Sequence, residues 1–149
     1  DAMSNEAIDI TSSQKTLEAN GAAIANNALA QADDASYGIV ADGLSYPDAR
    51  FVLTGTFSVA PTENSTLALY AQPLNIDGTA DADAPETTRP TQFIGTFVVN
   101  NVTTSQSLVC DAQDVPWEAD YYVHTNGTGQ TLGAGWKLLV TPCTMGPAA

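Results

Sequence analysis

The chain of 149 residues has few basic residues, few cysteines and a single histidine. Four lysines and arginines stand against 17 acidic residues, which gives a formal net charge of −13 at pH 7. Such a surface repels phosphate backbones and anionic lipid headgroups, so we expect neither nucleic acid nor a membrane as a partner. No apolar run approaches the roughly 20 residues of a membrane span, and the first residues lack a signal-peptide pattern. The letters "DAM" are compatible with an artificial addition before a natural start at Met3.

The scarcity of cysteine and histidine excludes a zinc site of the usual spacing, because the chain has no CxxC pair and only His124 as an imidazole ligand. Two interpretations remain for Cys110 and Cys143. They form one disulfide, or they are two small buried side chains in a reducing compartment, which we favour.

Period-two alternation dominates the chain from residue 50 onward. In "RFVLTGTFSV", for example, Phe51, Leu53 and Phe57 share one face of an extended segment. The segments of this kind are 50–59, 66–71, 91–99, 106–110, 120–125 and 135–141. Because turn-forming residues and no helical pattern separate them, residues 36–149 are predicted to form an all-β domain, an antiparallel β-sandwich or jelly roll.

Residues 1–35 read differently and are predicted to form an N-terminal arm or a short helix outside the sandwich. The segment "EAIDI" suits a short strand, whereas "ANGAAIANNALAQADD", residues 19–34, suits a helix broken near Gly21 or an irregular arm. Leu17, Ile24 and Leu29 are too few apolar residues for an independent helix, so this tract is expected to need a partner surface.

Catalytic patterns are weak in this sequence. His124 is the only imidazole base, no GxSxG motif accompanies it, and its alternation with Val123 indicates a surface or edge histidine of a strand. Glu118 and Asp120, beside Trp117, have the chemistry of a glycosidase pair, but a Glu-x-Asp spacing is common in an acidic chain. We therefore expect no enzymatic activity, no catalytic residue and no cofactor.

The acidic segment "NIDGTADADAPE" carries Asp77, Asp81, Asp83 and Glu86, which are oxygen ligands of the kind that calcium prefers. Its order does not match an EF-hand, because Gly78 comes too early and no glutamate stands at the twelfth position. We favour a long solvated loop that serves as a contact surface.

The segment "YYVHTNGTGQTLGAGWKL", residues 121–138, is predicted to be a β-hairpin with Tyr121 and Trp136 on matching strand faces. Aromatic rings next to amide and hydroxyl groups favour contact with a sugar or a protein partner. The candidate contact residues are Tyr121, Tyr122, Asn126, Thr128, Gln130 and Trp136.

Long phrases of the sequence resemble a family of small virion structural proteins encoded in tailed-bacteriophage and prophage genomes. The phrases are "LEANGAAIANNALAQADDASY", "YPDARFVLTGTF", "LALYAQPLNIDGTADADAPE", "RPTQFIGTFVVNNVTT" and "YYVHTNGTGQTLGAGWKLLVTP". The resemblance covers nearly the whole chain and supplies no catalytic residue. It implies assembly in a reducing bacterial cytoplasm, which argues against a disulfide.

Together with this resemblance, the sequence predicts a capsid decoration (cement) protein on the outside of a phage shell. Its expected partners are the major capsid protein, other virion proteins and copies of itself in a dimer or trimer. Two alternatives stay open. One is a tail fibre or baseplate domain that binds host-surface carbohydrate, and the other is a free carbohydrate-binding module.

Overall fold

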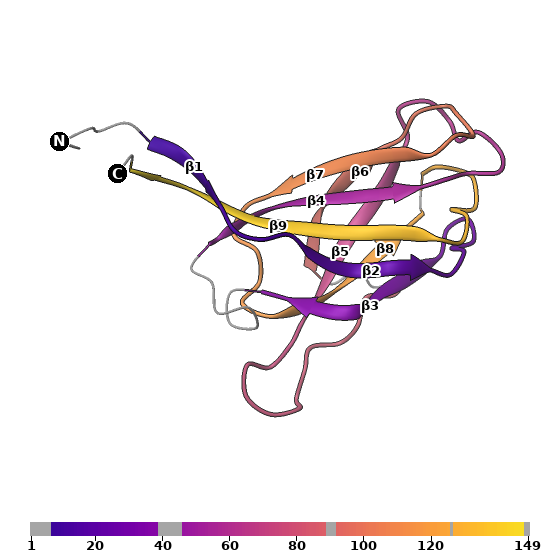
Figure 1. Cartoon of the computed structure of the whole chain (residues 1–149). Helices are drawn as coiled ribbons and strands as arrows, with labels where there is room; N and C mark the ends of the chain where they lie inside the picture. The colour runs from indigo at the N-terminus through magenta and orange to yellow at the C-terminus, as the bar shows by residue number, and fades with distance from the viewer. Residues whose placement is uncertain (1–6, 39–45, 89–91, 126, 148–149) are drawn as a thin grey trace.

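The computed structural model describes residues 7–38, 46–88, 92–125 and 127–147, and its regular elements there are all β-strands (Figure 1). None of these residues belongs to a helix that could cross a membrane. One sheet has five strands: β1 (Ala7–Thr11), β2 (Lys15–Gly21), β4 (Asp48–Gly55), β7 (Gln106–Ala112) and β9 (Trp136–Pro147). The other has four: β3 (Leu29–Tyr37), β5 (Thr66–Pro73), β6 (Gln92–Val98) and β8 (Ala119–His124). We call them the β9 sheet and the β8 sheet.

The two sheets pack face to face as an antiparallel β-sandwich, which confirms the predicted fold class. Their strand orders are β2-β9-β4-β7 and β3-β8-β5-β6, with β1 next to β9. The pairings are therefore nested along the chain, since β2 pairs with β9, β3 with β8, β4 with β7 and β5 with β6. Only the innermost pair, β5 and β6, consists of consecutive strands.

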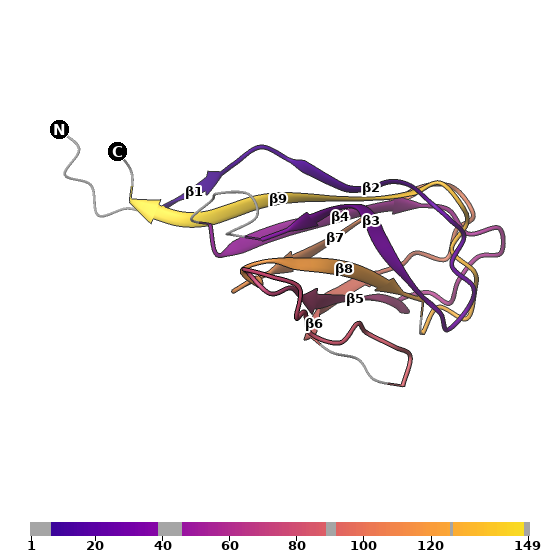
Figure 2. The same ribbon diagram turned by 90° about the horizontal axis from the view of Figure 1, so that it is seen from below.

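Strand β9 is long enough to serve two partners end to end along one edge. Its first half pairs with β2 from Trp136 to Val140, and its last half pairs with β1 from Cys143 to Pro147. On the other edge its ladder with β4 ends at Cys143. The pair of β1 and the end of β9 thus continues past the sandwich as a two-stranded ribbon (Figures 1 and 2). We call it the β1–β9 ribbon.

The core lies between the sheets and is filled by the inward side chains of both. Burial alternates along β7 with period two, as expected for a strand with one solvated face. At the centre, the ring of Phe51 from the β9 sheet lies 5.0 Å from Tyr121 and 6.2 Å from Tyr37 of the β8 sheet, between ring centroids. These aromatic contacts fix the two layers on each other.

The strands predicted from alternation after residue 50 are confirmed, as is the short strand near "EAIDI". The helix predicted for residues 19–34 is wrong, because this tract forms the end of β2, a turn and most of β3. Asn27 adopts a positive φ of 57° in that turn, a conformation that asparagine tolerates well. The boundary drawn between residues 35 and 36 falls inside β3.

Candidate functional site

The segment 121–138 is not a hairpin, because β8 and β9 belong to different sheets. The connection between them crosses one end of the sandwich and is held by backbone bridges and a side-chain hydrogen bond. Leu132 bridges both Ile24 and Phe57, and Thr125 Oγ1 donates a hydrogen bond to the Ala25 carbonyl at 2.6 Å. Alternation predicted both strands correctly but carried no information about their partners.

Burial contradicts the sugar contact predicted for three of the six candidate residues. Trp136 and Tyr121 lie in the core with at most 1 % of their surface exposed, and Thr128 is fully buried with its hydroxyl 3.0 Å from the Thr125 carbonyl. Rings in the core cannot stack on a ligand in this structure. Tyr122 and Gln130 are partly exposed, and Asn126 lies outside the described residues.

His124 is buried, contrary to the expectation of a surface or edge histidine. Its side chain is 5 % exposed, with Nε2 at 3.2 Å from Asn27 Oδ1 and its ring 6.1 Å from that of Tyr70. Burial lowers the pKa of the imidazole. The residue therefore serves as a packed, neutral hydrogen-bonding group on the outer side of β8.

Glu118 and Asp120 are both partly buried at the start of β8. Asp120 Oδ1 accepts a hydrogen bond from Ser36 Oγ at 2.5 Å, which ties β8 to β3. This contact shows that Asp120 helps to hold β3 against β8.

The acidic segment between β5 and β6 forms an extended loop that projects from the sandwich (Figure 1). Asp81 Oδ1 accepts a hydrogen bond from the Asn75 backbone at 2.7 Å, which closes a small turn at the base of the loop. Within the part of the chain that the structure describes, the carboxylates of this loop do not converge into a cluster of three ligands. The loop is solvated, as expected.

No disulfide joins Cys110 and Cys143, so the candidate pairing does not form in this structure. They lie on β7 and β9, the two strands that flank β4, opposite Phe51 and Asp48 respectively. Two strand spacings alone separate their backbones by at least about 10 Å, beyond the roughly 7 Å between Cα atoms that a disulfide permits. Burial raises the pKa of the Cys110 thiol.

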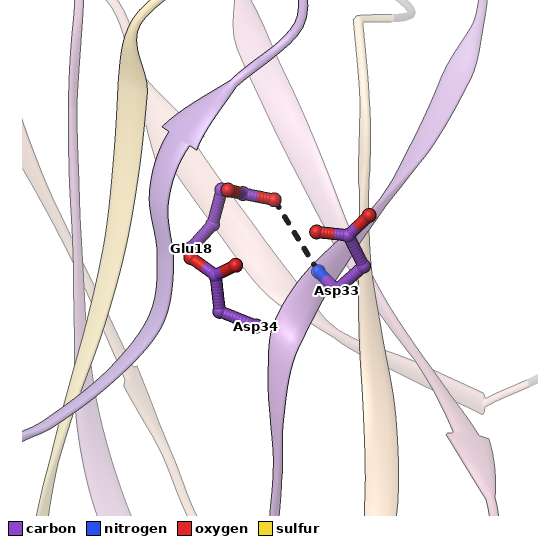
Figure 3. A group of neighbouring side chains, drawn as sticks. All are labelled: Glu18, Asp33 and Asp34. Carbon is purple, nitrogen blue, oxygen red and sulfur yellow. Dashed lines mark hydrogen bonds between the residues drawn. The ribbon is translucent and has the colours of Figure 1, made fainter.

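The described residues bring one group of three carboxylates together, namely Glu18, Asp33 and Asp34 (Figure 3). Glu18 Oε1 accepts from the Asp33 backbone at 3.3 Å, and Asp34 Oδ2 accepts from the Ala19 backbone at 2.7 Å. These bonds run between β2 and β3, the facing edge strands of the two sheets. The cluster thus closes one side of the sandwich with side-chain acceptors.

Burial raises the pKa of Glu18, and the neighbouring Asp34 carboxylate adds to the effect, while backbone hydrogen bonds from Asn20 and Asp33 oppose it. A raised pKa means that the folded state holds the proton more firmly than the unfolded chain does. The contribution of Glu18 to stability is therefore fully present below its unfolded pKa and falls as pH rises above about 4.3.

Replacing Glu18 with glutamine is expected to reduce the loss of stability between about pH 4 and pH 7, because the charge that burial penalises can no longer form. The measurement is the free energy of unfolding in urea at several pH values, for the native chain and Glu18→Gln. Glu63→Gln, at an exposed acid, is the matched control. If the free energy of unfolding varied with pH in the same way for the native chain and Glu18→Gln, the destabilising effect of the Glu18 charge would be contradicted.

A shallow groove of about 440 Å³ lies on the outer face of the β9 sheet, at the base of the β1–β9 ribbon. Thr11, Arg50, Asp111 and Cys143 are among its lining residues. Arg50 and Asp111 form a two-pronged ion pair with N–O distances of 2.7 and 2.9 Å, and this arginine lowers the pKa of the aspartate. The pair is well exposed, so it contributes little to folding.

A second surface is a cross-strand row on the outer face of the β8 sheet, and Tyr122 is its one residue among the contact residues that the sequence suggested. Gln31 pairs with Tyr122, Tyr122 with Tyr70, and Tyr70 with Phe93, so the row crosses all four strands at one level. We call it the aromatic row. The rings of Tyr70 and Phe93 meet edge to face at 5.7 Å, and Phe93 is 57 % exposed.

No family model, curated protein sequence or solved structure matches this chain.

Proposed function

We propose that the chain is a non-enzymatic structural protein of a tailed-phage virion, a decoration protein on the outside of the capsid shell. The resemblance to phage and prophage proteins supplies the particle, and the projecting ribbon supplies a means of attachment. We also infer that the sandwich is a jelly roll, since its strands pair in the nested order of a rolled double hairpin.

The β1–β9 ribbon is the observation that carries this proposal. Four residue pairs, from Ile10–Thr144 to Ala7–Pro147, extend it beyond the point where β4 leaves β9. A two-stranded ribbon is marginally stable by itself in water, so it gains stability from packing on another surface. The surface of a capsid shell offers such a support.

Charge and the groove favour the same assignment. A net charge of −13 keeps the protein away from packaged DNA and suits a basic patch on a shell subunit. The exposed Arg50–Asp111 pair at the base of the ribbon presents one positive and one negative group for polar contacts with a partner. The partners would be the major capsid protein, other virion proteins and further copies of the chain around a symmetry axis, as a dimer or trimer. Assembly in the bacterial cytoplasm accords with two cysteines that no disulfide joins.

The test compares the full chain with a variant that lacks residues 1–13, which removes β1 and leaves β2 intact. Particles of the source phage without this protein are mixed with either form, bound protein is measured after sedimentation, and gold-labelled antibody locates it by electron microscopy. The full chain is expected to label the head, and the shortened variant is expected to lose most of this binding. Val98→Ala, at an exposed residue on β6 of the other sheet, is the control and is expected to bind normally.

Thermal unfolding of each variant establishes that the sandwich is intact. Label confined to the tail tip would overturn the decoration role in favour of a tail domain. Particles without any label would overturn the virion role itself. Equal binding by the variant without β1 would contradict attachment through the ribbon.

A further inference from the structure

The aromatic row owes its exposed end to an irregularity in β6. Leu69 pairs with Gly95, but the next residue, Tyr70, pairs with Phe93, so Ile94 is the extra residue of a β-bulge. With regular pairing, Ile94 would stand opposite Tyr70. The bulge instead brings Phe93 opposite Tyr70 and leaves its ring 57 % exposed, while Ile94 packs against the core. Bulges that re-aim a side chain are common beside functional sites.

Hydrogen-bonded polar groups surround Tyr122, away from the Phe93 end of the row. The Tyr122 hydroxyl lies 3.1 Å from Gln72 Oε1 and 3.4 Å from Gln31 Oε1. Gln72 Nε2 in turn donates to the Ala82 carbonyl at 2.8 Å, which ties the amide to the base of the β5–β6 loop. Asp120, opposite Gln72 in the ladder, is held by Ser36. Two amides, a phenol and a carboxylate are thus ordered beside the partly buried Tyr70 and the exposed ring of Phe93 before any ligand arrives.

The chemistry of this face matches a sugar. Aromatic rings stack on the C–H faces of sugar rings, and ordered amide and carboxylate groups orient a ligand by bonding its hydroxyls. Three strands of the row, β8, β5 and β6, give a platform about 10 Å wide, which suits two neighbouring sugar units.

Charge narrows the class of sugar. The described basic residues, Lys15, Arg50 and Lys137, all lie on strands of the β9 sheet, and Asp120 contributes negative charge beside the row. An acidic protein of this kind repels uronic acids and sulfated or sialylated chains. A neutral polysaccharide meets no such repulsion.

We propose that the outer face of the β8 sheet, centred on Tyr70, Phe93, Tyr122 and Gln72, is a binding site for neutral polysaccharide. This site shares only Tyr122 with the candidate contact residues of the β8–β9 segment, and it does not depend on the decoration role. Phe93 provides the stacking platform, Tyr70 supports its ring from the side, and Gln72 and Asp120 bind hydroxyls.

The test is calorimetric titration of the full chain with cellohexaose, maltohexaose, xylohexaose and galactomannan, and with hyaluronan and polygalacturonate as acidic probes. At least one neutral probe is expected to bind, and the acidic probes are not. Phe93→Ala is expected to weaken binding about fivefold or more, because the stacking contact is lost. Val109→Ala is the matched control, since Val109 is an exposed apolar residue, 49 % exposed, on β7 of the other sheet.

Failure of all the neutral probes to bind would overturn the proposal, as would equal binding by Phe93→Ala and the native chain. Stronger binding of the acidic probes would contradict the charge argument. Sedimentation velocity tests whether a second copy of the chain, and not a sugar, binds to this face. The native chain could self-associate and bind no sugar, and Phe93→Ala could abolish this association. That result would assign the face to contacts between copies and overturn the sugar site.

Discussion

Replacing Trp136 with alanine is expected to lower the free energy of unfolding by about 3–5 kcal/mol, among the largest effects that a single substitution produces. The indole is 1 % exposed, so its removal leaves a cavity between the two sheets. Its Nε1 also donates a hydrogen bond to the Ala22 carbonyl at 2.8 Å, and alanine leaves that acceptor without this donor. Urea unfolding followed by circular dichroism measures the change.

Trp117→Ala is the matched control for this loss, because Trp117 is 64 % exposed. Its free energy of unfolding is expected to stay within about 0.5 kcal/mol of that of the native chain. Equal losses for the two tryptophans would contradict the position of Trp136 in the core. Loss of sugar binding by Trp136→Ala at full stability would restore the contact role that the sequence suggested.

The contrast between these tryptophans illustrates what alternation reveals. The pattern around Trp136 predicts a strand correctly, and it also predicts which residues share a face. It does not say which strand lies beside it. Pairing "YYVHT" with "GWKLL" as a hairpin predicts aromatic rings beside the loop that are available to a ligand. The true neighbours of β9 are β1, β2 and β4, which are distant in sequence, so the indole faces inward.

Local preference also misled the interpretation of residues 19–34. Alanine favours helices, and this tract holds many alanines, but tertiary packing overrides that preference in β2 and β3. Ala32 is buried and Ala30 packs against the core, so both contribute to the interior of the sandwich. The decisive contacts lie far along the chain, since Ile24 bridges Leu132 and Ala32 pairs with Tyr121.

The aromatic row was beyond sequence reasoning for a related reason. Alternation in "TLALYA" does place Tyr70 on the face opposite Leu67 and Leu69, so an outward aromatic was predictable there. Regular alternation also groups Phe93 with Phe97, which is buried. Only the bulge at Ile94 separates their faces, and only the ladder between distant strands aligns Phe93 with Tyr122.

Replacing Gly21 with alanine is expected to lower the free energy of unfolding by about 1–3 kcal/mol, the usual cost of overpacking a filled core. The sign is informative, because alanine at an unhindered glycine of a strand stabilises it by roughly 0.5–1 kcal/mol. A Cβ atom at Gly21 would stand 2.1 Å from Cε2 and 2.3 Å from Nε1 of Trp136. Urea unfolding measures the loss, and Asn20→Ala, at the exposed neighbour on β2, is the control.

The position of the indole explains why the clash with a Cβ atom at residue 21 cannot be relieved at low cost. Trp136 is enclosed by the core and tied to Ala22, the residue that follows Gly21, so the ring has no free direction in which to yield. If the clash is the cause, it must vanish with the ring. In the Trp136→Ala background, Gly21→Ala is therefore expected to cost little or nothing, and the two substitutions show a coupling energy of roughly 1–3 kcal/mol. An equal cost of Gly21→Ala in both backgrounds would show that the backbone of β2, and not the indole above it, requires glycine at this position.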